Sequence, residues 1–120
     1  FPAVPDLAIT AALIEAAREH VADHGGRMHT GINASDDAFY AETPEWISQL
    51  HSLGVLNVEM ESAALYVVAR LRGLRAGMIC AASSNLVTGA SLYDKKNELL
   101  RSGWMASIEI ALETAVRLDL

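Results

Sequence analysis

Apolar residues recur along the chain at spacings that predict four helices. From Asp6, a residue type that often caps helices, apolar positions repeat every three or four residues until the glycine pair at 25–26. The same signals predict helices from Pro44, with Thr43 as its cap, to about Leu53, from about residue 63 to residue 72, and from Leu92 to the chain end. The buried stripe of the last helix is expected to comprise Leu99, Leu100, Trp104, Ile108, Ala111, Leu112 and Ala115.

Three shorter apolar segments, at residues 27–33, 55–58 and 74–82, predict strands between these helices. The last is the most apolar, so we expect it at the centre of a sheet. Residues 34–37 are expected to form a turn and residues 87–91 a flexible loop. Alternating helices and strands favour an α/β fold, a layered and mainly parallel sheet with flanking helices. A chain of 120 residues predicts a single domain over residues 1–120.

Composition excludes several classes of partner. Hydrophobic residues make up 52% of the chain and charged residues 20%, which is typical of a globular domain. The net charge of −6, with no basic patch, argues against nucleic acid polymers and anionic membranes. Cys80 has no second cysteine with which to form a disulfide, and no apolar run approaches the ~18 residues of a membrane span. We therefore expect a cytoplasmic protein.

Two carboxylates flank a methionine where the strand at 55–58 gives way to the next helix. Glu59, Met60 and Glu61 thus occupy the carboxyl end of a strand, where α/β sheets bind ligands. If the backbone stays extended through Met60, both carboxylates lie on one side of the chain. Alternatively, the two glutamates only begin the next helix, where negative charge interacts favourably with the helix dipole.

Other polar or aromatic residues follow the neighbouring predicted strands. Phe39 comes after the first strand, and Ser83, Ser84 and Asn85 come after the third. With the two glutamates they would suit a ligand that has a flat ring and a diol, because carboxylates accept hydrogen bonds from adjacent hydroxyls and an aromatic ring can stack. Phe39 as a core aromatic is the alternative.

A possible metal pair is weaker. His20 and His24 lie one helical turn apart, but they lack the glutamate of a His-Glu-x-x-His site and an obvious third ligand. We expect them to form an exposed helix end, and we expect no metal and no cofactor.

Three segments of the chain resemble a known family. They are His-Thr-Gly-Ile-Asn-Ala-Ser-Asp-Asp-Ala-Phe-Tyr at 29–40, Asn-Val-Glu-Met-Glu-Ser at 57–62, and Gly-Leu-Arg-Ala-Gly-Met at 73–78. These segments resemble the nucleoside phosphorylases, which include uridine phosphorylase and the hexameric bacterial type of purine nucleoside phosphorylase. The resemblance covers nearly the whole chain but only the later portion of a family member. It implies a phosphorylase-like fold without its N-terminal part, whose loop and arginines bind phosphate in the family.

The resemblance also implies roles for individual residues. Glu61 would hold the ribose hydroxyls, Met60 would pack against the sugar, Glu59 would line the same pocket, and Phe39 would stack on the base. The reaction would be phosphorolysis of a ribonucleoside to free base and ribose 1-phosphate, with phosphate as co-substrate. Positive charge develops on the ribose as the glycosidic bond breaks, and a carboxylate on the sugar interacts more strongly with it then. A homo-oligomer, a dimer-based hexamer, would follow by the same resemblance.

The resemblance does not decide which nucleoside base the protein would act on. Purine enzymes of the family carry an aspartate where this chain has Ser84, and a serine hydroxyl is a poor general acid. Uridine enzymes carry a glutamine and an arginine near the places of Thr43 and Glu45. The sequence of residues 73–78 resembles uridine phosphorylase more closely, which favours uridine as the substrate. The alternatives are a purine nucleoside phosphorylase, a nucleosidase of the same superfamily that uses water, or a non-catalytic nucleoside-binding fragment.

Overall fold

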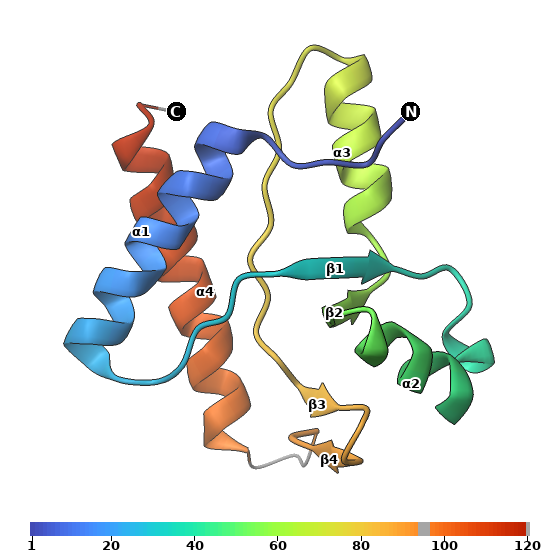
Figure 1. Cartoon of the computed structure of the whole chain (residues 1–120). Coiled ribbons are helices and arrows are strands. Elements are labelled where there is room, and N and C mark those ends of the chain that lie inside the picture. The colour runs from blue at the N-terminus through green and yellow to red at the C-terminus, as the bar shows by residue number, and fades with distance from the viewer. Residues whose placement is uncertain (94–96, 120) are drawn as a thin grey trace.

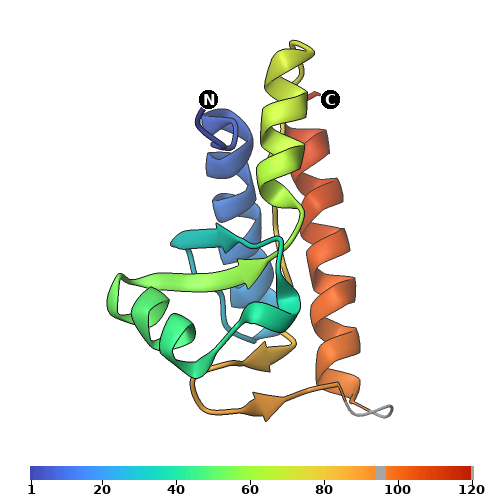
Figure 2. The same ribbon diagram turned by 90° about the vertical axis from the view of Figure 1, so that its right-hand side faces the viewer.

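A computed structural model describes residues 1–93 and 97–119 of the chain. In these ranges it contains the helices α1 (Leu7–His24), α2 (Pro44–Ser52), α3 (Ser62–Leu71) and α4 (Glu98–Arg117), and the short 3₁₀ helix η1 (Phe39–Ala41) (Figure 1). Its strands are β1 (Ile32–Ser35), β2 (Val55–Glu59), β3 (Ser84–Asn85) and β4 (Ala90–Ser91). Seen from the side, α1, α3 and α4 stand upright and the β1–β2 pair runs across them (Figure 2). The predicted α/β class is confirmed.

Helices α1 and α4 lie side by side and enclose the main core. Four buried residues form its centre and three half-buried residues pack against them: Leu13, Ala16, Ala17 and Ile110, with Ile9, Met28 and Ile79. The small alanine side chains on α1 allow the two helices to approach closely. Of the stripe predicted for α4, Leu100 is buried, whereas Leu99, Trp104, Ile108 and Leu112 are exposed.

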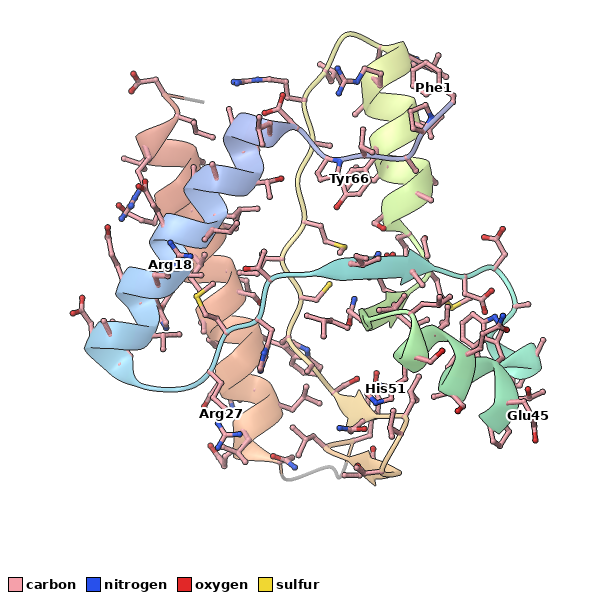
Figure 3. The ribbon with its side chains drawn as sticks, viewed as in Figure 1. Phe1, Arg18, Arg27, Glu45, His51 and Tyr66 are labelled. Atoms are coloured by element: carbon pink, nitrogen blue, oxygen red, sulfur yellow. The ribbon has the colours of Figure 1, made fainter. Side chains whose placement is uncertain are left out.

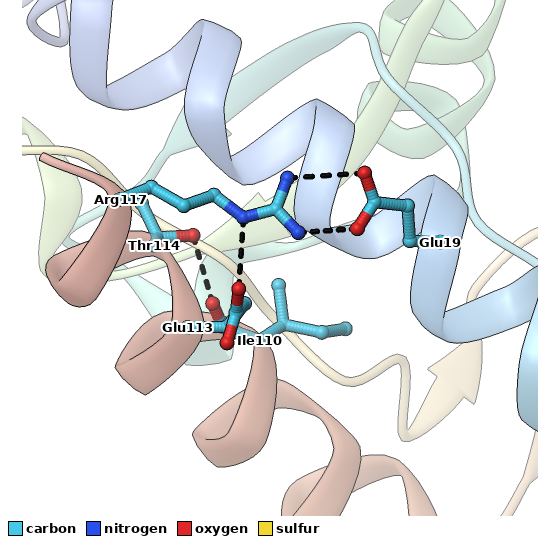
Figure 4. A network of polar contacts seen from close by, with 5 residues as sticks. All are labelled: Glu19, Ile110, Glu113, Thr114 and Arg117. Atoms are coloured by element: carbon cyan, nitrogen blue, oxygen red, sulfur yellow. Dashed lines mark hydrogen bonds and ion pairs between the residues drawn. The ribbon is translucent and has the colours of Figure 1, made fainter.

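A polar network on one side of this helix pair links its two members (Figure 4). The guanidinium of Arg117 donates to both carboxylate oxygens of Glu19 on α1 and, at 3.1 Å, to Glu113 one turn earlier on α4. Beneath it, Thr114 Oγ1 donates to the carbonyl of Ile110 at 2.8 Å, which satisfies a buried hydroxyl. Because the Arg117 pairs are exposed, we assign them to the alignment of the helices and not to a large share of stability.

Local signals locate the helix starts well. Asp6 Oδ1 accepts a 3.0 Å hydrogen bond from the Ile9 amide, and Thr43 Oγ1 accepts one of 3.2 Å from the Trp46 amide. Both predicted caps are confirmed. The last helix begins later than the predicted Leu92, because Asn97 caps it by accepting from the Leu99 amide at 3.0 Å. Residues 94–96 of that predicted helix lie outside the described residues.

The parallel pair β1–β2 is the part of the sheet that carries the candidate site. Asn33 pairs with Asn57 and Ser35 pairs with Glu59 across it. The strand predicted at residues 27–33 was placed too early, because β1 begins at Ile32 and continues through residues 34 and 35, which were predicted as a turn. Residues 34 and 35 stay in the strand because they pair with Val58 and Glu59 of β2, and Ser35 Oγ also accepts a hydrogen bond from the Ala63 amide at the start of α3.

The predicted central strand at 74–82 is wrong. This apolar segment runs extended between α1 and α3 without a ladder (Figure 1). In its backbone hydrogen bonds to other described parts of the chain, the Leu74 amide donates to the Ala69 carbonyl of α3 at 2.8 Å, and the Asp6 amide donates to the Ala76 carbonyl at 2.7 Å. No described strand pairs with it. The segment instead packs Ile79 against the core. No helix in the described parts of the chain is long and apolar enough to cross a membrane.

The loop predicted at 87–91 is also corrected. Ser84 pairs with Ser91 and Asn85 with Ala90, so these residues form a small antiparallel hairpin, β3–β4. Asn85 Oδ1 accepts 3.0 Å hydrogen bonds from the amides of Val87 and Thr88, and this fixes the turn between the strands.

Candidate functional site

The carboxylate of Glu59, at the carboxyl end of β2, is the centre of the polar groups in this region. Its Oε1 accepts from Asn33 Nδ2 at 2.7 Å and from Ser62 Oγ at 2.5 Å. Its Oε2 accepts from the backbone amides of Glu61 at 2.8 Å and Ser62 at 2.7 Å. These amides belong to the first turn of α3, whose N–H groups have no partner within the helix. Glu59 therefore joins β1, β2 and α3 at one point.

These hydrogen bonds determine the charge of Glu59. Burial raises the pKa of its carboxyl, but the bonds from Ser62, Asn33 and the two backbone amides outweigh burial and lower that pKa from 4.5 to about 2. Glu59 is therefore negatively charged at neutral pH, and its charge faces the positive end of the α3 dipole. The alternative interpretation of the sequence is therefore correct for Glu59 in one respect, its interaction with the helix dipole, although Glu59 itself is the last residue of β2.

We expect this pKa to appear as a pH dependence of stability. A carboxyl whose pKa is lower in the folded protein contributes stability above its unfolded pKa and loses it as the pH falls. The window runs from about pH 4.5 down to about pH 2. Allowing for solvent screening of a half-buried group, the contribution is about 1–2 kcal/mol.

Urea unfolding of the protein and of Glu59→Gln at several pH values checks this expectation. The difference between their free energies of unfolding should be largest near pH 6 and should shrink steadily towards pH 2. A difference that is the same at pH 6 and pH 3 would show that the carboxylate charge is not involved.

A row of polar side chains across the two strands supports Glu59. Asn57 Nδ2 donates to Asn33 Oδ1 at 2.6 Å, and Asn33 Nδ2 donates to Glu59 and also to Ser62 Oγ at 3.0 Å. Ser35 Oγ accepts from the Ala63 amide at 3.3 Å. Sequence reasoning missed these residues. The signal was available, because polar residues at alternate positions of two strands share one face.

Glu61 differs from Glu59 in its surroundings. It occupies the N-cap position of α3 and is exposed, and the chain bends at Met60, so the extended backbone assumed from the sequence ends at Glu59. Its carboxylate accepts one hydrogen bond, of 3.3 Å, from the Met60 amide. A carboxylate has about four acceptor positions, so most of those on Glu61 can take hydroxyls from a ligand.

The aromatic residue predicted for the site lies in an exposed turn after β1. Phe39 is 60% exposed in η1, so it is not a core residue of the described chain. Its ring meets that of Tyr40 edge to face, with centroids 5.4 Å apart. The loop before it is fixed to β2 by a 2.8 Å bond from the Asp36 amide to the Glu59 carbonyl. Because β1 and β2 are parallel, this loop and Glu61 both follow the same edge of the sheet.

The sequence of the chain matches a known family. The model of the phosphorylase superfamily matches residues 1–118. The chain belongs to the phosphorylase superfamily.

Several named nucleoside phosphorylases are similar to this chain over most of its length. A guanosine phosphorylase of Halorubrum lacusprofundi is 36% identical over 98% of the chain, and a DeoD-type purine nucleoside phosphorylase of Hahella chejuensis is 36% identical over 97%. A uridine phosphorylase of Thermococcus kodakarensis is 42% identical over 73% of the chain. These matches cover 49%, 46% and 35% of the relatives, so the chain spans half of their length or less.

Two further residues lie near the glutamates, Cys80 on the extended segment 74–82 and Tyr66 on α3. Burial raises the pKa of the Cys80 thiol, and the nearby charges of Glu59 and Glu61 raise it further. Burial and the Glu59 charge likewise raise the pKa of Tyr66, which points from α3 toward this segment (Figure 3). Neither residue was predicted for the site. The position of Cys80 depends on the path of the extended segment 74–82, whereas Tyr66 lies on α3, the helix that follows Glu59.

The third set of predicted site residues lies in the β3–β4 hairpin. Ser84 Oγ donates to Ser91 Oγ at 3.3 Å, Asn85 holds the hairpin turn, and the Ser83 carbonyl accepts from the Leu92 amide at 2.7 Å. Across residues 1–93 and 97–119, no hydrogen bond links Ser83, Ser84 or Asn85 to either glutamate of the site. Their part in binding stays a prediction.

The histidine pair on α1 forms contacts within the helix bundle. The rings of His20 and His24 stack with centroids 4.4 Å apart, and His20 Nδ1 lies 3.8 Å from a carboxylate oxygen of Glu109 on α4. In the described ranges, no group of three or more His, Cys, Asp or Glu side chains has an arrangement that could hold a metal ion.

Proposed function

We propose that this protein catalyses phosphorolysis of a ribonucleoside to free base and ribose 1-phosphate. The observation that carries the proposal is the contrast between the two glutamates at the end of β2. Glu59 is hydrogen-bonded to the protein itself, whereas Glu61 is exposed with acceptor positions free. The family and the similar guanosine, uridine and purine nucleoside phosphorylases support the same activity.

In this proposal Glu61 accepts hydrogen bonds from the ribose hydroxyls and Met60 packs against the sugar. Bond breaking leaves positive charge on the ribose, and the Glu61 carboxylate stabilises that charge more than it stabilises the neutral substrate. Glu61 thus acts by charge and positioning. Phe39 stacks on the base, and Ser83, Ser84 and Asn85 bind near its edge. Glu59 lies beside the sugar. The co-substrate is phosphate, and the reaction uses no cofactor.

Uridine is the substrate that we propose, with a purine nucleoside as the alternative. Ser84 stands where an acid would protonate a purine ring, and a hydroxyl performs that step poorly at neutral pH. The similar proteins include both uridine and purine enzymes, so both substrates belong in the assay. The homo-oligomer and the cytoplasmic location implied by the sequence stay predictions. The exposed apolar residues Leu65, Val68 and Leu71 of α3 are compatible with further packing.

The test of the proposed function is whether base release needs phosphate. We expect the complete protein to release uracil from uridine only when inorganic phosphate is present, with one ribose 1-phosphate formed for each base. Chromatography of the products with and without phosphate measures both. Base release that continues unchanged without phosphate, with free ribose as product, would instead identify a nucleosidase. Nucleoside binding without turnover would identify a non-catalytic protein.

A further inference from the structure

The hydrogen bonds around Glu59 use nearly all the acceptor positions of its carboxylate. Its four donors fill both oxygens of the carboxylate, two on each. Since a carboxylate has about four acceptor positions, Glu59 has little capacity left for the hydroxyls of a sugar. A contribution of Glu59 to catalysis must therefore pass through the groups that it holds.

Those groups control the backbone that carries Glu61. Glu59 Oε2 binds the amide of Glu61 itself and the amide of Ser62, so it fixes the first turn of α3 on both sides of the Glu61 α-carbon. Without these bonds the N-terminal turn would have to satisfy its free amides with water. A displacement of about 1 Å in a group that positions the substrate can reduce a rate by about 100-fold.

We call the hydrogen bonds that Glu59 accepts from the Glu61 and Ser62 amides the clamp. Asn33 anchors this clamp to the other strand. Its Nδ2 donates to both Glu59 Oε1 and Ser62 Oγ, while its Oδ1 accepts from Asn57. The amide thus needs donor and acceptor ends together, and a residue with only one of the two functions cannot replace it. Because Asn33 and Asn57 are paired in the parallel register, the rigid sheet determines where Glu59 lies.

We infer that Asn33 and Glu59 are positioning residues that hold the Glu61 carboxylate against the ribose by clamping the backbone at the start of α3. The inference rests on the proposed function of Glu61. It differs from a direct sugar contact by Glu59, because the effect of either residue should disappear when Glu61 has been removed.

A double-mutant cycle with Glu61 tests the inference. In the complete protein, Asn33→Ala should lower kcat/KM for uridine about 10-fold or more, mainly through kcat. In a Glu61→Ala background the same change should lower the remaining rate by less than about 2-fold. Equal factors in both backgrounds would overturn the inference. Glu59→Gln, which keeps the side-chain shape, should behave in the same way and serves where Asn33→Ala folds poorly.

Amide hydrogen exchange provides a readout that does not depend on activity. The amides of Glu61 and Ser62 should be protected in the unmodified protein and should exchange at least about 10-fold faster in Asn33→Ala. The matched control is Asn97→Ala, which removes a helix-capping asparagine from α4 and should leave both amides and kcat/KM unchanged. Unchanged exchange in Asn33→Ala would disprove the clamp, even in a protein without turnover. By contrast, a normal rate in Glu61→Ala with a confirmed clamp would contradict the proposed function alone.

Discussion

Replacing Glu61 by alanine is expected to lower kcat/KM about 30-fold or more, which corresponds to about 2 kcal/mol of transition-state stabilisation. The physical reason is that, in the proposed reaction, the carboxylate would bind a sugar that becomes positively charged only as the glycosidic bond breaks. Most of the loss should therefore appear in kcat and less in KM. Initial rates of uridine phosphorolysis over a range of uridine concentrations, at saturating phosphate, measure the two parameters separately.

The control for this change is Glu98→Ala. Glu98 is also an exposed glutamate at the start of a helix, but it lies in the first turn of α4, away from the β1–β2 pair. It should leave kcat/KM within about 2-fold of the unmodified value, since an exposed substitution outside a site has a small effect. Glu61→Gln separates charge from hydrogen bonding, because glutamine keeps an acceptor oxygen but loses the negative charge. An unchanged rate in Glu61→Ala would remove this residue from the mechanism.

The sequence placed two glutamates at the end of a strand but could not distinguish their surroundings. Glu59 and Glu61 are the same residue type, two positions apart, at a strand-to-helix junction. What separates their roles is Asn33, which reaches Glu59 from another strand 26 positions away in the chain. Which side chains meet across two distant strands depends on the register of the pair, and the register of a parallel pair cannot be predicted from one sequence.

Local features were predicted better than long-range ones for the same reason. The caps at Asp6 and Thr43 act over three residues, so the sequence around them contains the whole interaction. The strand predicted at 74–82 needed a neighbouring strand, and an apolar composition does not supply one. The extended path of that segment then decided that Cys80, which was not predicted, lies near the glutamates.

Gly77→Ala is expected to destabilise the protein by about 1–3 kcal/mol, the usual cost of adding a methyl group to a packed core. Gly77 passes over α1, and a Cβ there would collide with Cγ2 of Ile9 and lie 3.3 Å from Cδ1 of Leu13. Ile9 cannot easily turn away, because a β-branched side chain in a helix has one strongly preferred rotamer. Leu13 is buried in the core cluster. Chemical denaturation at neutral pH measures the change in the free energy of unfolding.

Gly31→Ala is the matched control, because it adds the same methyl group where the neighbour can move. A Cβ at Gly31 would meet the outer atoms of Leu56, a side chain that is 59% exposed and free to rotate into solvent. Loss of glycine also restricts the unfolded chain, which favours the folded state by about 0.4–1 kcal/mol in either variant. Gly31→Ala should therefore be close to neutral while Gly77→Ala is destabilising. If the two variants unfold at the same denaturant concentration, the contact between Gly77 and α1 has room for a methyl group, and the prediction is wrong.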